Sequence, residues 1–192
     1  QNNKMKIINW KNSEAVKIAK KVIKTGGVLV YPTDTIYGFG VNAKDPVAID
    51  KLNTMKNRTG PISVLAPDRK TVTTWLNVKE EEKLNAANYL DSRNTIIYPV
   101  RENIVNEMIM GPNNTLGIRI PDHPFCSLIS NSCTTPITTT SVNRTGEPPK
   151  NNVEGILKSF PIDIDLIIED GNLINSASEI YVYNIDGLKK IR

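Results

Sequence analysis

The chain has 192 residues, of which 39% are hydrophobic and 23% are charged, and its net charge is +4. This length suits a single domain with a substantial core, or at most two small domains. No apolar run approaches the roughly 20 residues needed to cross a bilayer, and the first residues lack the basic-then-apolar order of a signal peptide. The mild positive charge is compatible with nucleotide or RNA binding but requires neither.

The chain contains two cysteines, Cys126 and Cys133. Seven residues of one predicted helix would place their Cα atoms about 10 Å apart. That separation is too large for a disulfide, so we expect a reduced, cytoplasmic setting. With one histidine and no Cys-x-x-Cys pair, a structural zinc site is not expected.

The first elements are a strand and a helix. Residues 6–10 fit a short strand, and apolar residues then recur at helical spacing from Ala15 to Ile23. Ser13 is a suitable N-cap and Gly26-Gly27 a suitable stop. The pattern therefore predicts a helix over residues 14–24.

Residues 28–40, with the sequence VLVYPTDTIYGFG, combine an apolar strand with a polar loop. The β-branched run is typical of a buried strand, and Pro32 turns it into hydroxyl-rich chain. Open α/β sheets bind ligands beyond the carboxyl ends of their strands. Gly38 and Gly40 would allow close backbone approach to a ligand or a positive φ. Alone, the pattern favours an ordinary strand-to-helix connection.

Strands and helices alternate through the rest of the chain. A helix is predicted from the Asp45-Pro46 cap to Lys56, and another over residues 79–90 with acids in its first turn. Shorter helices are expected over 104–110, around 125–129 and around 153–157. The predicted strands are residues 62–66, 95–100, 115–120, 137–140, 164–168 and 180–185. This alternation predicts an α/β sheet with helices on its faces.

Three segments carry more polar groups than plain connections need: residues 33–37, Lys56-Asn57-Arg58 and residues 138–146. Each has an ordinary explanation, such as cations that offset a helix dipole. Together they offer cations for phosphate, with hydroxyls and amides for sugar, amino acid or base. The chain has neither a P-loop nor a Gly-x-Gly-x-x-Gly motif. His123 is more typical of a helix start than of a general base.

Five motifs, taken in order, resemble the YrdC/TsaC family. They are Tyr31–Gly38, Lys56-x-Arg58, Pro61–Leu65, Leu116–Pro124 and Thr139–Gly146. Each motif alone is weak, but the ordered combination is specific. The resemblance implies a single domain over residues 1–192: a twisted, open mixed α/β sheet with flanking helices around a basic concave cavity.

The resemblance also implies synthesis of L-threonylcarbamoyladenylate from L-threonine, bicarbonate and ATP, with release of pyrophosphate. The product would pass to a tRNA threonylcarbamoyl transferase complex, and direct tRNA contact is possible. No acidic metal cluster is evident, so Mg²⁺ would arrive with ATP. An alternative is a non-catalytic RNA- or nucleotide-binding relative, although no basic run or aromatic platform demands it. The similar domain of hydrogenase maturation proteins is accompanied by zinc-finger cysteines, which this chain lacks.

The family pattern, carried over position by position, assigns the site residues. Those expected at threonine are Thr35, Arg119, Thr139 and Ser178, with Arg119 on the carboxylate. Lys56 and Arg58 would hold the phosphates of ATP and act as catalytic groups by stabilising charge. Thr115, Ser141 and Asn143 are expected on the nucleotide side, and Arg192 matches a late nucleotide-contacting arginine. Such a reaction needs positioning more than a protein nucleophile.

Overall fold

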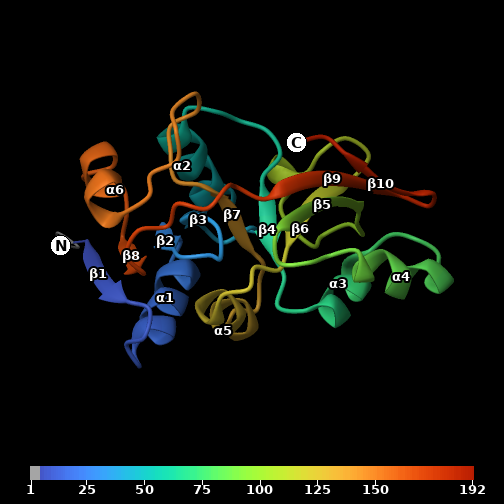
Figure 1. The fold of residues 1–192 in the computed structure, drawn as a ribbon, viewed down its shortest axis with the longest axis horizontal. Helices are drawn as coiled ribbons and strands as arrows, with labels where there is room; N and C mark the ends of the chain where they lie inside the picture. Colours follow the sequence, from blue (N-terminus) through green and yellow to red (C-terminus); the bar gives the residue numbers. More distant parts are fainter. Residues whose placement is uncertain (1–4) are drawn as a thin grey trace.

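The computed structural model describes residues 5–192 (Figure 1). Ten strands form one sheet in the order β1-β8-β2-β3-β7-β4-β6-β5-β9-β10. The strands are β1 (Lys6–Asn9), β2 (Leu29–Tyr31), β3 (Gly38–Gly40), β4 (Ser63–Leu65), β5 (Asn94–Pro99), β6 (Thr115–Arg119), β7 (Ile137–Ser141), β8 (Leu166–Glu169), β9 (Glu179–Asn184) and β10 (Gly187–Lys190). The helices are α1 (Ala15–Lys24), α2 (Pro46–Lys56), α3 (Arg69–Trp75), α4 (Lys83–Asn88), α5 (Pro124–Ser132) and α6 (Val153–Ser159).

The sheet is mixed. β1, β2 and β8 run parallel, as do β4 with β6 and β5 with β9, whereas β3 and β7 pair antiparallel to their neighbours. Around β2, helices α1 and α5 bury residues such as Ala19 and Phe125 on one face, and α2 and α6 bury Leu52 and Ile156 on the other. Figure 1 shows these two pairs of helices on opposite sides of the strands. The predicted class, a mixed α/β sheet with flanking helices, is confirmed.

Helix α2 has the predicted bounds. The Asp45 carboxylate accepts hydrogen bonds from the backbone N–H groups of Val47 (3.0 Å) and Ala48 (3.2 Å), and Pro46 occupies the first turn. Asn57 follows in the left-handed conformation (φ 54°) and ends the helix. Capping at both ends explains why this helix could be located from sequence.

The prediction of Ser13 as the N-cap of α1 is wrong. The helix begins at Ala15 after Glu14, which makes no side-chain capping bond, and Asn12 Oδ1 accepts from the Glu14 N–H at 2.9 Å. The amide of Asn12 therefore organises the turn that Ser13 was expected to organise.

The connection predicted after residue 31 is instead a hairpin, because Gly38–Gly40 forms β3 antiparallel to β2. Neither Gly38 nor Gly40 takes a positive φ. An added Cβ at either position would lie 2.9 Å from the Tyr31 ring, which packs across the hairpin. At Gly40 the Cβ would lie equally close to Ile137, so close side-chain packing requires glycine at both positions.

Several short elements also differ from the expectation. Residues 79–90 divide into a 3₁₀ turn (Glu80–Glu82) and α4, and residues 104–110 hold only a 3₁₀ turn (Glu107–Ile109). Helix α3 and strand β10 were not predicted. The seven residues of α3 bury only Val72, so its apolar stripe is too short to detect. Among the helices of residues 5–192, none is both long and apolar enough to cross a membrane.

Candidate active site

A cavity of about 640 Å³ lies over the middle of the sheet, between β5, β6, β7, β9 and the β2–β3 connection. This volume is within the usual range for small-molecule sites. The predicted site residues that line it are Thr35, Arg58, Thr115, Arg119, Thr139, Ser141, Asn143, Ser178 and Arg192. Lys56 does not line it. The fold thus brings together residues that are spread over most of the sequence.

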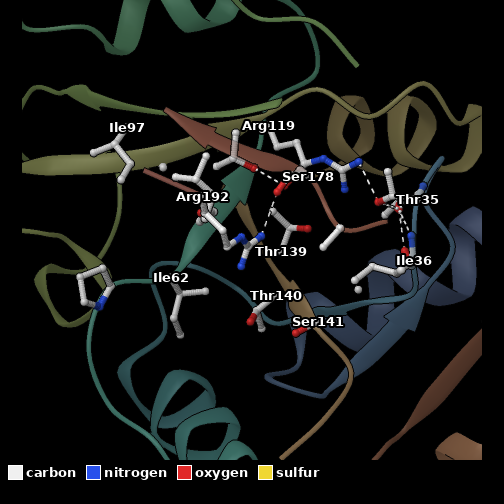
Figure 2. Close-up of a pocket in the computed structure, with 18 of the residues that line it drawn as sticks. Thr35, Ile36, Ile62, Ile97, Arg119, Thr139, Thr140, Ser141, Ser178 and Arg192 are labelled. Atoms are coloured by element: carbon white, nitrogen blue, oxygen red, sulfur yellow. Dashed lines mark hydrogen bonds between the residues drawn. The ribbon is translucent and has the colours of Figure 1, made fainter. Parts of the chain in front are cut away.

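The cavity lining is cationic. Arg58, Arg119 and Arg192 contribute to it, and within residues 5–192 no aspartate or glutamate does. Isoleucines such as Ile62 and Ile97 supply an apolar part of the wall (Figure 2). Such a lining suits a ligand that combines anionic groups with an apolar or aromatic group.

The β2–β3 connection presents Thr35 to the cavity. Thr33 Oγ1 accepts hydrogen bonds from the backbone N–H groups of Thr35 and Ile36, both at 3.1 Å, and closes a tight turn. Thr35 Oγ1 then lies 3.1 Å from Arg119 Nη2, which donates to it. Thr33 is therefore structural, and Thr35 lies beside a cation in the cavity wall.

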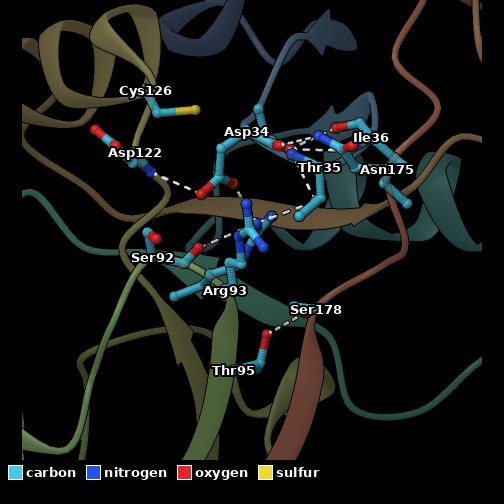
Figure 3. A network of polar contacts seen from close by, with 12 residues as sticks. Asp34, Thr35, Ile36, Ser92, Arg93, Thr95, Asp122, Cys126, Asn175 and Ser178 are labelled. Atoms are coloured by element: carbon cyan, nitrogen blue, oxygen red, sulfur yellow. Dashed lines mark hydrogen bonds and ion pairs between the residues drawn. The ribbon is translucent and has the colours of Figure 1, made fainter.

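Arg119, at the end of β6, is almost buried. Its Nη2 donates to Asp34 Oδ1 at 2.6 Å and to Ser92 O at 3.4 Å, while Asp34 Oδ2 accepts from the Asp122 N–H at 3.1 Å. Figure 3 shows Asp34 between Asp122 and Thr35. Arg119 Nε is buried and has no hydrogen-bond partner in the described part of the chain. No local pattern in the sequence pairs Asp34 with Arg119, which lies 85 positions away.

Lys56 is buried and holds the segment that follows β7. Its Nζ donates to Ser141 O, to Asn143 Oδ1 at 2.8 Å and to Asn143 O at 3.3 Å. Ser141 Oγ also donates to Asn143 Oδ1, at 2.8 Å. Burial, with the nearby charge of Arg58 adding to it, lowers the pKa of Lys56 to about 8. The ammonium group thus fixes two lining residues from behind the cavity wall.

The remaining lining residues form two groups. Arg58 is exposed at the cavity, and its Nη2 donates to Pro61 O at 3.0 Å. Ser178 Oγ shares a hydrogen bond with Thr95 Oγ1 at 2.8 Å, and Arg192 Nη2 donates to Ser178 O at 2.9 Å (Figure 2). Thr95 was not predicted as a site residue, because nothing local marks it.

Neither the two cysteines nor the histidine is among the residues that line the cavity. Both cysteines are free thiols; burial raises the pKa of Cys126, whose Sγ donates to Pro32 O at 3.2 Å. His123 is the N-cap of α5: its Nδ1 accepts from the Phe125 N–H at 3.1 Å. Its Nε2 lies 2.9 Å from Asp170 Oδ2. The interpretation of His123 as a helix-start residue is confirmed.

Residues 21–192 match the family that comprises Sua5, YciO and YrdC and is described as "telomere recombination". The chain belongs to this family. A similar relative is the threonylcarbamoyl-AMP synthase of Hydrogenovibrio crunogenus, 32% identical over 92% of this chain and 96% of that protein.

Two solved structures of the Sua5/YciO/YrdC family show the same fold. P. abyssi Sua5 complexed with L-threonine matches with a TM-score of 0.84 and 25% identity over 98% of this chain, which spans 57% of that longer protein. E. coli YciO matches with a TM-score of 0.85 and 20% identity, covering 98% of this chain and 95% of its own. The predicted family and fold are confirmed.

Proposed function

We propose that this chain is a threonylcarbamoyl-AMP synthase, a nucleotidyltransferase that joins L-threonine, bicarbonate and ATP and releases pyrophosphate. The observation that carries the proposal is the arginine-lined cavity, built from the residues that the family pattern selects and, within residues 5–192, free of carboxylates. The similarity to a synthase along nearly the whole of both chains supports it. We take residues 1–192 as one YrdC-like domain, because one sheet runs through the described part.

The lining residues divide into two proposed subsites. Threonine would contact Thr35, Thr139 and Ser178, with its carboxylate on Arg119. The phosphates of ATP would contact Arg58, with Thr115, Ser141 and Asn143 on the nucleotide side. Lys56 supports this side by holding Ser141 and Asn143. Direct contact between Lys56 and a phosphate stays a prediction.

The proposed chemistry requires no protein nucleophile. The threonine amine takes up bicarbonate with loss of water and becomes a carbamate. A carbamate oxygen then attacks the α-phosphorus, and the bond to pyrophosphate breaks. Arg58 stabilises the charge that develops on the leaving group, and the threonine subsite holds the carbamate in line. Cys126 is buried with a raised pKa, which agrees with a route that uses no thiolate.

Mg²⁺ would accompany ATP and be held by its phosphates, where it would supply charge neutralisation. Residues 5–192 contain no cluster of three acidic, histidine or cysteine side chains able to hold a metal, and the cavity supplies hydroxyls and arginines. We further propose a cytoplasmic location, with the product passed to a tRNA threonylcarbamoyl transferase complex.

The test is pyrophosphate release by the purified protein with MgATP and bicarbonate, with and without L-threonine. We expect release only with L-threonine, and D-threonine is the matched control substrate. Threonine-independent release, or none, would contradict the proposal. Tight tRNA binding in a protein without turnover would instead favour a non-catalytic RNA-binding relative.

A further inference from the structure

Asp34 lies behind the cavity wall, where it is not a lining residue, and its carboxylate is fixed at both oxygens. Oδ1 pairs with Arg119 Nη2 at 2.6 Å, and Oδ2 accepts from the Asp122 N–H at 3.1 Å. The two side chains are 13% and 6% exposed, so solvent screens their attraction weakly. The backbone carbonyl of Asp34 accepts from Asn175 Nδ2 at 2.9 Å, which ties the same residue to the β8–β9 connection.

Within the described residues, the side-chain hydrogen bonds that Arg119 donates all run through Nη2. Arg119 lines the cavity, and its Nε is buried with no hydrogen-bond partner in the described residues. Because Nε is closed to solvent, a ligand oxygen in the cavity would bind Arg119 through its terminal nitrogens. A carboxylate has the planar geometry that a guanidinium edge binds.

The pairing of Asp34 with Arg119 also means that the three arginines of the cavity differ in how far their charge is neutralised. Within residues 5–192, Arg119 has a carboxylate partner, whereas Arg58 and Arg192 have none within ion-pair distance. A polyphosphate carries several negative charges and is attracted most to cations whose charge is not neutralised. The Arg119 end therefore suits a single carboxylate, and the Arg58 end suits phosphates.

We propose that Asp34 is a positioning residue that orients and neutralises Arg119, so that this end of the cavity accepts the amino-acid carboxylate and rejects polyphosphate. The inference rests on the proposed function and adds to it a reason why threonine and ATP do not exchange places.

The experiment compares Asp34→Asn with Asp122→Asn. Both remove one acidic charge from the same region, but no hydrogen bond or ion pair in the described structure joins the exposed Asp122 side chain to Arg119; the backbone N–H of Asp122 donates to Asp34. In Asp34→Asn, KM for threonine should rise about tenfold or more through misorientation of Arg119, while KM for ATP stays near that of the wild type. Inorganic tripolyphosphate should become a competitive inhibitor against threonine in Asp34→Asn alone.

Asp34→Glu keeps the charge and serves as a second variant if Asp34→Asn does not fold. It should remain resistant to tripolyphosphate competition at the threonine site although its KM for threonine rises. If Asp34→Asn raises KM for threonine and KM for ATP and lowers kcat to similar extents, the proposal is overturned. It is also overturned if the wild type is active and Asp34→Asn leaves KM for threonine unchanged. A wild type that neither binds threonine nor turns over would instead overturn the proposed function, and with it this role.

Discussion

Arg58 and Ser178 both line the cavity, but their different surroundings predict different losses of activity when each is replaced by alanine. Arg58 has no carboxylate partner in the described residues, whereas the Ser178 hydroxyl already pairs with Thr95 Oγ1. We expect Arg58→Ala to lower kcat/KM by about 10²-fold through lost charge stabilisation. Ser178→Ala should lower it by about tenfold or less, as for one neutral hydrogen bond. Steady-state pyrophosphate release measures both values.

Arg101→Ala is the matched control for Arg58→Ala, because Arg101 is also an exposed arginine but does not line the cavity. It should leave kcat/KM unchanged. Equal losses in Arg58→Ala and Ser178→Ala would show that the phosphate subsite has been assigned to the wrong residue.

Lys56 should leave a signature in the pH dependence of stability. Its pKa falls from the ordinary value of 10.5 to about 8 in the folded protein. Between these two values the unfolded state binds more protons than the folded state, so this contribution to the free energy of unfolding rises with pH. From pH 7 to pH 10, wild type should gain roughly 2 kcal/mol relative to Lys56→Met.

Urea unfolding at both pH values measures this difference, and the comparison between the two proteins removes contributions from other groups. Lys51→Met, at a half-exposed lysine of the same helix, is the control and should show no comparable change. A difference between wild type and Lys56→Met that is constant with pH would mean that Lys56 keeps its ordinary pKa.

Among the elements, the β2–β3 hairpin is the one whose glycines the structure explains most directly. The three atoms nearest to a Cβ on Gly38 would all belong to Tyr31, the closest at 2.9 Å. Gly38→Ala should therefore destabilise the protein by about 1–3 kcal/mol, as overpacking does. Denaturant unfolding measures the change.

The same substitution in a Tyr31→Leu background provides the control, because the smaller side chain leaves room for the methyl group. There the cost of Gly38→Ala should shrink to a fraction of its value in the wild type. Additive costs would show that the ring is not what requires glycine at position 38.

Elements with strong local signals could be predicted, and elements made by tertiary contact could not. Helix α2 has Asp45 and Pro46 at its start and a left-handed Asn57 at its end, so both limits are visible in the sequence. Strand β3, with two glycines in three residues, has low β-propensity and exists because β2 and β7 pair with it on both sides. The prediction of a loop there followed local propensity, and the sheet overrides it.

Across the whole molecule, local composition marked three polar segments of the later cavity, but only the order of family motifs joined them with Thr115, Arg119 and Ser178 into one site. Arg119 and Asp34 are separated by 85 positions, and Ser178 and Thr95 by 83. Neither pair carries a local pattern. Asp34 reaches Arg119 because the β2–β3 connection lies at the end of β6, and Thr95 reaches Ser178 because β5 and β9 pair in the sheet. The partners of Lys56 lie in the Ser141–Asn143 segment, which is remote in sequence. The sequence therefore predicts Lys56 at a phosphate but does not reveal that it holds this segment.

One cavity that holds both substrates predicts coupled stabilisation of the whole molecule. A ligand at 100 times its Kd raises the free energy of unfolding by about 2.7 kcal/mol, provided that it binds only the folded state. ATP and threonine together should raise the melting temperature by more than the sum of their separate shifts, because the first ligand orders the cavity and the second then pays less of that entropy cost. Thermal unfolding with each ligand, with both and with neither measures this coupling. Arg119→Ala should abolish the shift with threonine and keep the shift with ATP, whereas loss of both shifts would mean that Arg119 supports the entire cavity and not the threonine end alone.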